Sequence, residues 1–244
     1  MKTEFIMGIP VDCISYKKVI EDAHRYIENN QKMSIISVNP QIVVESKKYP
    51  EIISFIQHST HRIPDGIGIV MISKLTGGDI KERIAGFDMM KELLLYANNN
   101  KKSIFLYGAK PAVLTDAIKN IASIYPQIDI LGGIDGYTSL SDSEIVAQIN
   151  RCHPNFLFVA LGFPKQEQWL AKNINILSVN VFQDVGGSFD VLSGHVKRAP
   201  QFYIDHHLEW LYRSLSNPAR IGRIFQLPFF IVKSLWWKLK GGNK

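Results

Sequence analysis

Short, continuous apolar runs alternate with segments of helical periodicity along most of this chain. Six runs have the length and the β-branched composition of strands: Phe5–Gly8, Ser34–Val38, Ser103–Tyr107, Ile128–Leu131, Phe156–Leu161 and Val179–Phe182. Continuous rather than alternating apolar residues are typical of strands that are covered on both faces. The pattern therefore predicts an α/β fold in which helices flank a mostly parallel sheet and the crossovers are right-handed.

The segments between these runs are expected to form helices. They are Tyr16–Glu28, Pro40–Lys47, Pro50–Gln57, Gly66–Leu75, Asp88–Asn98, Ala112–Tyr125, Asp142–Asn150 and Lys165–Lys172. Several carry helix start signals, since Ser15 and Ser141 are N-cap residues and Pro111 lies in a first helical turn. This order of elements predicts a Rossmann-like α/β domain over residues 1–195.

The character of the chain changes after Gly194. Three helices are expected there, broken by Pro218 and Pro228: Gln201–Ser216, Pro218–Gln226 and Pro228–Lys240. The net charge of the chain is +6, yet residues 196–244 alone hold nine Lys and Arg against two acids. Because all of the excess positive charge lies in this tail, we predict a small helical C-terminal appendage, residues 196–244, that meets an anionic partner.

Composition and cysteine content exclude several classes of protein. Apolar residues make up 46% and charged residues 20% of the chain, which is ordinary for a globular protein and unlike a disordered or fibrous one. Cys13 and Cys152 cannot form a disulfide framework or a metal site by themselves. No signal peptide is recognised, and no uncharged apolar run approaches the roughly 18 residues of a membrane span. We therefore expect a cytoplasmic protein that does not cross a membrane.

Five strand-to-helix turns have unusual sequences, and ligands of open parallel sheets collect at such turns, beyond the carboxyl ends of the strands. The turns are Ser37-Val38-Asn39-Pro40, Pro64-Asp65-Gly66, Gly108-Ala109-Lys110-Pro111, Leu161 to Trp169 with Lys165, Gln166 and Glu167 in one helical turn, and Gln183 to Asp190 with paired glycines. Glycine lets phosphate oxygens approach the N–H groups at a helix start, which indicates nucleotide chemistry. Each turn also has an ordinary alternative: Asn39 and Asp65 can cap helices, and the glycines can serve tight turns.

The signatures of dinucleotide and metal sites are missing from these turns. Neither GxGxxG nor GxxxxGK[ST] occurs. No Asp-x-Asp follows a strand and no dense His, Asp and Glu cluster is present, so we expect neither a divalent metal nor a cofactor. A nicotinamide oxidoreductase has only the sheet topology in its favour, and a nucleic-acid-binding module has only the basic tail.

Taken in order, the turns and the tail resemble the WecG/TagA/CpsF family of bacterial glycosyltransferases over nearly the whole chain. The segments that carry this resemblance are SVNPQIV, IPDGIGIV, ERIAGFDMM, FLYGAK, GGIDGY, FVALGFPKQEQWL, DVGGSFDVLSGHVKRAPQ and EWLYRSLSNPARIGR. It implies an inverting, metal-independent transferase that uses a UDP-sugar donor and a polyprenyl-diphosphate-linked acceptor. The teichoic-acid branch of the family implies transfer of N-acetylmannosamine from UDP-N-acetylmannosamine to N-acetylglucosaminyl-diphospho-undecaprenol. Other branches leave open N-acetylmannosaminuronic acid or a hexose such as glucose, for exopolysaccharide or common-antigen synthesis.

The resemblance also implies roles for individual residues. Asp65 is the expected catalytic base, and Asn39, Arg83 and Gln166 are expected to contact substrate. Ser37 keeps a hydroxyl where relatives often have Thr. The other residues expected to bind substrate are Gly108, Tyr137, Gly186, Gly187, Asp190, Arg213, Arg220 and Arg223. The pair Gln183-Asp184 departs from the more apolar approach to the paired glycines that relatives have.

The composition of the tail, residues 196–244, is consistent with the lipid-linked acceptor that the resemblance implies. An undecaprenyl acceptor stays in the bilayer, so the enzyme must reach it there. Aromatic residues alternate with Lys and Arg, which suits the headgroup boundary of an anionic membrane; they are Phe225, Phe229, Phe230, Trp236 and Trp237. The alternative is that these aromatics are ordinary core. We expect a peripheral protein on the inner face of the bacterial membrane, with no nucleic-acid partner and with a homo-oligomer left open.

Overall fold

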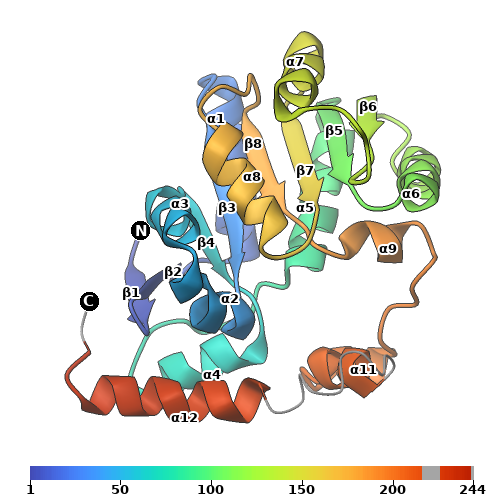
Figure 1. The fold of residues 1–244 in the computed structure, drawn as a ribbon. Coiled ribbons are helices and arrows are strands. Elements are labelled where there is room, and N and C mark those ends of the chain that lie inside the picture. Colours follow the sequence, from blue (N-terminus) through green and yellow to red (C-terminus); the bar gives the residue numbers. More distant parts are fainter. Residues whose placement is uncertain (216–225, 243–244) are drawn as a thin grey trace.

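A six-stranded parallel sheet forms the centre of the molecule (Figure 1). The structure is a computed structural model that describes residues 1–215 and 226–242, except the side chain of Arg213. The strands lie in the order β4-β3-β8-β7-β5-β6. Their bounds are β3 (Met33–Val38), β4 (His61–Pro64), β5 (Ser103–Gly108), β6 (Asp129–Ile134), β7 (Phe156–Ala160) and β8 (Val181–Asp184). The predicted α/β fold with a mostly parallel sheet is confirmed.

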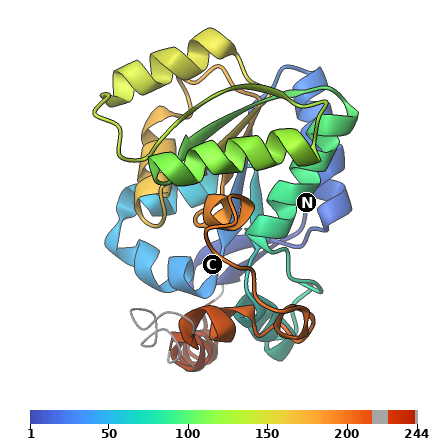
Figure 2. The same ribbon diagram turned by 90° about the vertical axis from the view of Figure 1, so that its right-hand side faces the viewer.

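Helices cover both faces of this sheet (Figure 1, Figure 2). One core lies under α1 (Tyr16–Glu28), α5 (Gly86–Asn99), α6 (Pro111–Ile124) and α9 (Ser188–Leu192). The other lies under α2 (Pro40–Glu45), α3 (Pro50–His58), α4 (Ile67–Leu75), α7 (Asp142–Cys152) and α8 (Lys165–Asn173), and the 3₁₀ turn η1 (Ser46–Lys48) joins α2 to α3. Phe156 and Phe158 of β7 face the first core, and Leu157 and Val159 face the second. This alternation explains why the strands are apolar throughout.

The N-terminal strand and the edge strand differ from expectation. The expected strand Phe5–Gly8 is confirmed only at Phe5 and Ile6. Strand β1 (Thr3–Ile6) ends before Met7 and Gly8, where the chain turns, and it pairs antiparallel with β2 (Ile9–Asp12), outside the main sheet. Strand β4 was not expected, because its sequence His61-Arg62-Ile63-Pro64 mixes charge, proline and a single aliphatic residue. Such a sequence fits an edge strand, where polar side chains reach other elements.

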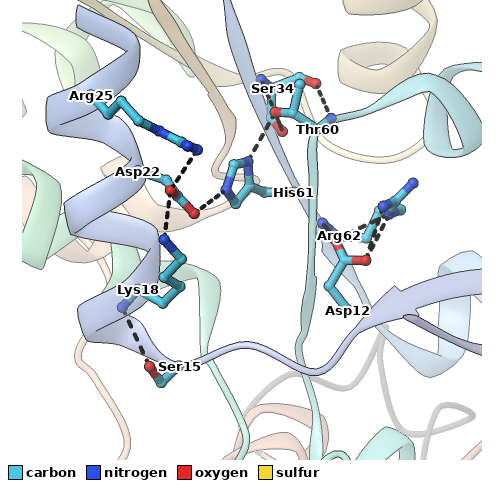
Figure 3. Close-up of polar contacts among 9 residues, drawn as sticks. All are labelled: Asp12, Ser15, Lys18, Asp22, Arg25, Ser34, Thr60, His61 and Arg62. Atoms are coloured by element: carbon cyan, nitrogen blue, oxygen red, sulfur yellow. Dashed lines mark hydrogen bonds and ion pairs between the residues drawn. The ribbon is translucent and has the colours of Figure 1, made fainter. Parts of the chain in front are cut away.

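A buried polar network ties β4 to the hairpin and to α1 (Figure 3). Asp12, at the end of β2, accepts hydrogen bonds from Arg62 N at 2.7 Å and from Arg62 Nη2 at 2.9 Å. On α1, Asp22 Oδ2 lies 3.2 Å from His61 Nε2. Because β4 leads directly into Asp65, this network anchors the strand that precedes Asp65, and Asp65 N donates to Val38 O of β3 at 2.9 Å.

The C-terminal segment packs back on the α/β core. It contains α10 (Gln201–Asp205), α11 (Glu209–Leu215) and α12 (Gln226–Leu239), and α12 lies against α2 and α4 (Figure 1). Phe230 on α12 is fully buried in the core that α2 and α4 share. None of the helices in the described part of the chain is long and apolar enough to span a membrane. The predicted division into residues 1–195 and 196–244 stays a prediction.

Two expectations for this segment are wrong. The helix expected over Gln201–Ser216 is interrupted around His207, which has φ +58°, so α10 and α11 are separate. Pro228 does not break a helix, since α12 begins at Gln226. A proline in the first turn is tolerated there because its missing N–H would have no helical partner. Pro218 lies outside the described residues.

Candidate active site

The carboxyl ends of four neighbouring strands, β4, β3, β8 and β7, meet above a cavity of about 600 Å³. Each end leads into one of the turns that the sequence analysis selected. Eight of the residues predicted to act on substrate line this cavity: Ser37, Asn39, Asp65, Arg83, Gln166, Gly186, Gly187 and Asp190. The strand order therefore assembles the turns that follow β3, β4, β7 and β8 into one site.

A second cavity of about 260 Å³ adjoins the first. It lies between the start of α4 and the C-terminal segment, where His207, Trp210 and Leu227 line it. Five residues line both cavities: Asn39, Gln41, Asp65, Arg83 and Glu209. Asp65 and Arg83 thus lie where the two cavities meet.

Arg83 lies between two carboxylates at this junction. Its Nε is 3.7 Å from Asp65 Oδ1, and its Nη2 donates to Glu209 Oε2 at 3.0 Å. Burial opposes the positive charge, but Asp65 and Glu209 outweigh that effect and raise the pKa of Arg83 above its ordinary value. Arg83 Nε is buried and makes no hydrogen bond of normal geometry within the described residues. Arg83 therefore keeps an Nε–H that can donate a hydrogen bond to a ligand.

Glu209 was not selected from the sequence as a site residue, although it opens the EWLYR segment. It comes from α11 in the C-terminal segment and is only 4% exposed. Its contact with Arg83 means that the tail completes the polar lining of the site. Contacts across 126 residues of sequence cannot be read from local patterns.

Gly86 separates the side chains of Ser37 and Asp65. A Cβ at Gly86 would lie 2.7 Å from Ser37 Oγ and 3.6 Å from Asp65 Oδ2. A Cβ at this position would force the Ser37 hydroxyl to shift, whereas its distance to Asp65 is an ordinary contact. The segment ERIAGFDMM contains this glycine, which is a signal that the sequence analysis used only for Arg83.

Of the two residues that could cap a helix, Asn39 does so in the structure and Asp65 does not. Asn39 is the N-cap of α2, and its Oδ1 accepts a hydrogen bond from Ile42 N at 3.0 Å while the residue also lines both cavities. Gly66, and not Asp65, is the N-cap residue of α4. The Asp65 side chain is about one quarter exposed, so it has access to the cavities that it lines.

Gln166 joins two turns of the site. Its Oε1 accepts hydrogen bonds from Gly162 N and from Gly186 N, each at 3.1 Å, and its Nε2 donates to Glu167 Oε1 at 2.9 Å. The side chain therefore clamps the turn after β7 to the turn after β8. The N–H of Gly186, a residue that the sequence analysis expects to bind substrate, already has this partner.

Glu167 and Asp184 form a buried pair of carboxyl groups at the inner wall of the larger cavity. They are 0% and 2% exposed, and they lie within hydrogen-bonding reach of each other. Burial raises the pKa of Glu167 to about 7. Burial also raises the pKa of Asp184 well above its ordinary value, and Glu167 raises it further. The sequence analysis noted both residues without placing them in the site.

The departure Gln183-Asp184 has a structural explanation. Gln183 Nε2 donates to Gly86 O at 2.9 Å, and Asp184 Oδ1 accepts from Ser37 N at 2.9 Å. These two polar residues at the end of β8 therefore fix the start of α5 and the end of β3.

Two predicted residues of the described part of the chain do not line the two cavities. Gly108 ends β5, where a Cβ would lie 2.3 Å from the carbonyl oxygen of Ala160, so glycine there permits strand packing. Tyr137 follows β6 and is 71% exposed. Strands β5 and β6 lie in the other half of the sheet, which explains why neither residue lines the two cavities. Arg220 and Arg223 lie outside the described residues, as does the side chain of Arg213.

Two further features of the described residues concern other kinds of site. No group of three or more His, Cys, Asp or Glu side chains could hold a metal ion within these residues, and a metal-free mechanism stays a prediction. A cavity of about 640 Å³ between α3 and α8 is lined by Lys32, His58 and Lys172 among others. It contains none of the predicted residues.

Comparison with known proteins gives consistent matches over almost the whole chain. The model of the glycosyl transferase WecG/TagA/CpsF family matches residues 5–244. Three relatives share the name N-acetylglucosaminyldiphosphoundecaprenol N-acetyl-beta-D-mannosaminyltransferase. The protein of Bacillus subtilis (strain 168) is 41% identical over 96% of this chain and 92% of its own. The protein of Bacillus spizizenii (strain ATCC 23059 / NRRL B-14472 / W23) is 40% identical over 86% and 81%, and that of Staphylococcus aureus (strain MW2) is 32% identical over 93% and 90%.

Proposed function

We propose, from the premise that the chain belongs to the WecG/TagA/CpsF family of glycosyltransferases, that it transfers N-acetylmannosamine to N-acetylglucosaminyl-diphospho-undecaprenol. The donor is UDP-N-acetylmannosamine, and the product enters the synthesis of teichoic acid or a related cell-surface polymer. The shared name of the relatives favours N-acetylmannosamine over the uronic acid and glucose alternatives.

The observation that carries this proposal is the position of Asp65 where two cavities meet. A glycosyl transfer brings two substrates together at one anomeric carbon, so its base must reach the space between them. A carboxylate in that place can take the proton of the acceptor hydroxyl as the new bond forms. Inversion follows from a single displacement in which the acceptor attacks opposite the departing diphosphate.

The two cavities suit the two substrates differently. The larger one is lined by Gly187, in the turn after β8, and by Lys197, groups that suit a nucleoside diphosphate. The smaller one is lined by Trp210 and Leu227 of the C-terminal segment, beside α12. We assign the UDP-sugar to the larger cavity and the acceptor to the smaller one. Arg83, which lines both, can stabilise charge on the departing diphosphate.

A turnover assay with purified protein tests this function directly. UDP-N-acetylmannosamine and N-acetylglucosaminyl-diphospho-lipid should give product, while UDP-glucose and UDP-N-acetylglucosamine should give much less. The rate should be the same in EDTA, because N–H and guanidinium groups are expected to replace a metal at the diphosphate. A higher rate with another donor would contradict the donor assignment. Loss of the rate in EDTA, with recovery on adding magnesium, would contradict the metal-free mechanism.

The outer face of α12 supports a location at the membrane surface. Phe229, Val232, Trp236 and Leu239 are spaced by 3, 4 and 3 residues and are 57%, 68%, 58% and 86% exposed. This spacing places them on one side of the helix, away from the buried Phe230. Lys233 lies over the Phe229 ring and Lys240 over the Trp236 ring, at 5.2 and 3.8 Å from the ring centroids. An apolar stripe bordered by lysines suits an anionic bilayer surface.

We predict that the double substitution Trp236→Ser/Leu239→Ser reduces binding to anionic vesicles at least about tenfold, because burying such side chains accounts for a few kcal/mol. Flotation with phosphatidylglycerol vesicles measures the effect. Ile124→Ser is the matched control, since Ile124 is 60% exposed on α6, away from α12. Equal flotation of the double variant and wild type would contradict the role of the stripe.

A further inference from the structure

The two buried carboxyl groups behind the larger cavity have an unusual set of partners. Glu167 Oε1 accepts from Gln166 Nε2, and Asp184 Oδ1 accepts from Ser37 N. The remaining oxygens, Glu167 Oε2 and Asp184 Oδ2, are buried and accept no hydrogen bond of normal geometry from a donor in the described residues, and the buried Ser37 hydroxyl is a further group that acts on Asp184. The two carboxyl groups lie within hydrogen-bonding reach of each other. One proton placed between them would satisfy both remaining oxygens.

Two ionised carboxylates in this place would be costly for two reasons. Both are almost completely buried, and burial without compensating charge disfavours ionisation. The charged side chains that line the same cavity are Asp65, Arg83, Asp190, Lys197 and Glu209. Arg83 already contacts Asp65 and Glu209, and Asp65 itself raises the pKa of Asp184.

We propose that Glu167 and Asp184 share one proton, and that this proton keeps Gln166 in place and lowers the negative charge that a nucleoside diphosphate meets in the cavity. Both residues are positioning residues. Through Gln166 they hold the turns at Gly162 and Gly186, and through Ser37 they hold the end of β3. The effect on the diphosphate rests on the proposed function, whereas the shared proton does not.

The direction of the pH dependence follows from the folded and unfolded states. The pKa of Glu167 is about 7 in the folded chain and 4.5 when unperturbed. The folded state therefore binds this proton more tightly, and the free energy of unfolding decreases as the pH rises from about 4.5 to about 7. Ionisation of Glu167 near pH 7 completes this loss, so Tm should be lower at pH 8.5 than at pH 5.5, and KM for the donor should be higher above pH 7.

Amide substitutions reproduce the shared proton without its titration. In Glu167→Gln the new NH₂ can donate to Asp184 Oδ2, and in Asp184→Asn it can donate to Glu167 Oε2. Each single variant therefore keeps the contact between the two side chains at every pH. In the double variant two NH₂ groups face each other, if Gln166 Nε2 and Ser37 N keep their acceptors. The double variant should be much less stable than either single variant.

Thermal unfolding at pH 5.5 and 8.5 tests the shared proton without any substrate. Each single variant should raise Tm at pH 8.5 by about 5 °C over wild type and should flatten the difference between the two pH values. The double variant should unfold about 5 °C or more below both single variants. Glu92→Gln, on the exposed face of α5, is the control and should behave as wild type.

The KM for UDP-N-acetylmannosamine, measured from pH 6 to 9, tests the consequence for binding. It should rise about tenfold above pH 7 in wild type and much less in Glu167→Gln. Parallel pH profiles of Tm for wild type and both single variants would overturn the shared proton, as would a double variant as stable as the singles. If the double variant does not fold, the pH profiles of Tm of the two single variants decide whether the proton is shared. If the Tm values agree with these predictions but the protein transfers no sugar from UDP-N-acetylmannosamine, the proposed function is contradicted and the shared proton is not.

Discussion

Asp65→Asn should lower turnover by about 10² to 10⁴-fold while KM for the donor and Tm change little. The substitution keeps the size and shape of the side chain but removes the group that accepts the proton. Asp65 lies where both cavities meet, so the loss should appear in kcat. Steady-state kinetics with a soluble, short-chain lipid-linked acceptor measure it without the membrane.

The fold should tolerate this change because Arg83 keeps its second carboxylate, Glu209, at 3.0 Å. Asp129→Asn is a suitable control, since Asp129 is exposed on β6 at the opposite edge of the sheet. Activity of Asp65→Asn within a few-fold of wild type would show that Asp65 is not the base. The side chain would then have only a structural role beside α4.

Arg83→Met should lower kcat/KM by about 10² to 10³-fold, as expected for loss of one donor to a charge that develops in the transition state. It should also lower Tm. Glu209 is 4% exposed and would lose the guanidinium at 3.0 Å, a loss on the order of 3 kcal/mol for a buried ion pair. For a chain of this size that corresponds to a decrease in Tm of about 6–12 °C.

Arg83→Lys separates the two effects. It keeps a positive charge near Glu209, so most of the stability should return, but an ammonium cannot bind a diphosphate through two parallel hydrogen bonds. The rate should therefore stay low. Arg151→Met, at the exposed end of α7, is the control. A normal rate in Arg83→Met, measured at a temperature where it is folded, would refute a role of Arg83 at the diphosphate.

The sequence predicted the parallel sheet because its signals are local. Strands such as Phe156–Ala160 are apolar in every position, and helix starts such as Ser141, a full capping box with Glu144, lie within four residues of sequence. The strand-to-helix turns also identified most of the site, since ligands of open parallel sheets bind at these turns. The specific family followed from the order of several motifs along the chain.

The strand order could not be read from the sequence, and it decided which turns share a cavity. Local patterns gave no reason to prefer Gly186 over Gly108, yet β8 lies beside β3 and β7 whereas β5 lies in the other half of the sheet. Hydrophobic periodicity predicts which residues are buried, but it does not predict which strands are neighbours in the sheet. Gly108 and Tyr137 were therefore selected with the same justification as residues that do line the site.

The sequence by itself determined most of the elements, the family and the position of Asp65 in a turn that opens a helix. Only the tertiary structure decided which charges meet there. Glu209 reaches Arg83 from the tail, and Glu167 and Asp184 are brought together from the first turn of α8 and the end of β8. The physical reason is that electrostatic effects depend on distance and burial in space, and both are set by packing between segments far apart in the chain.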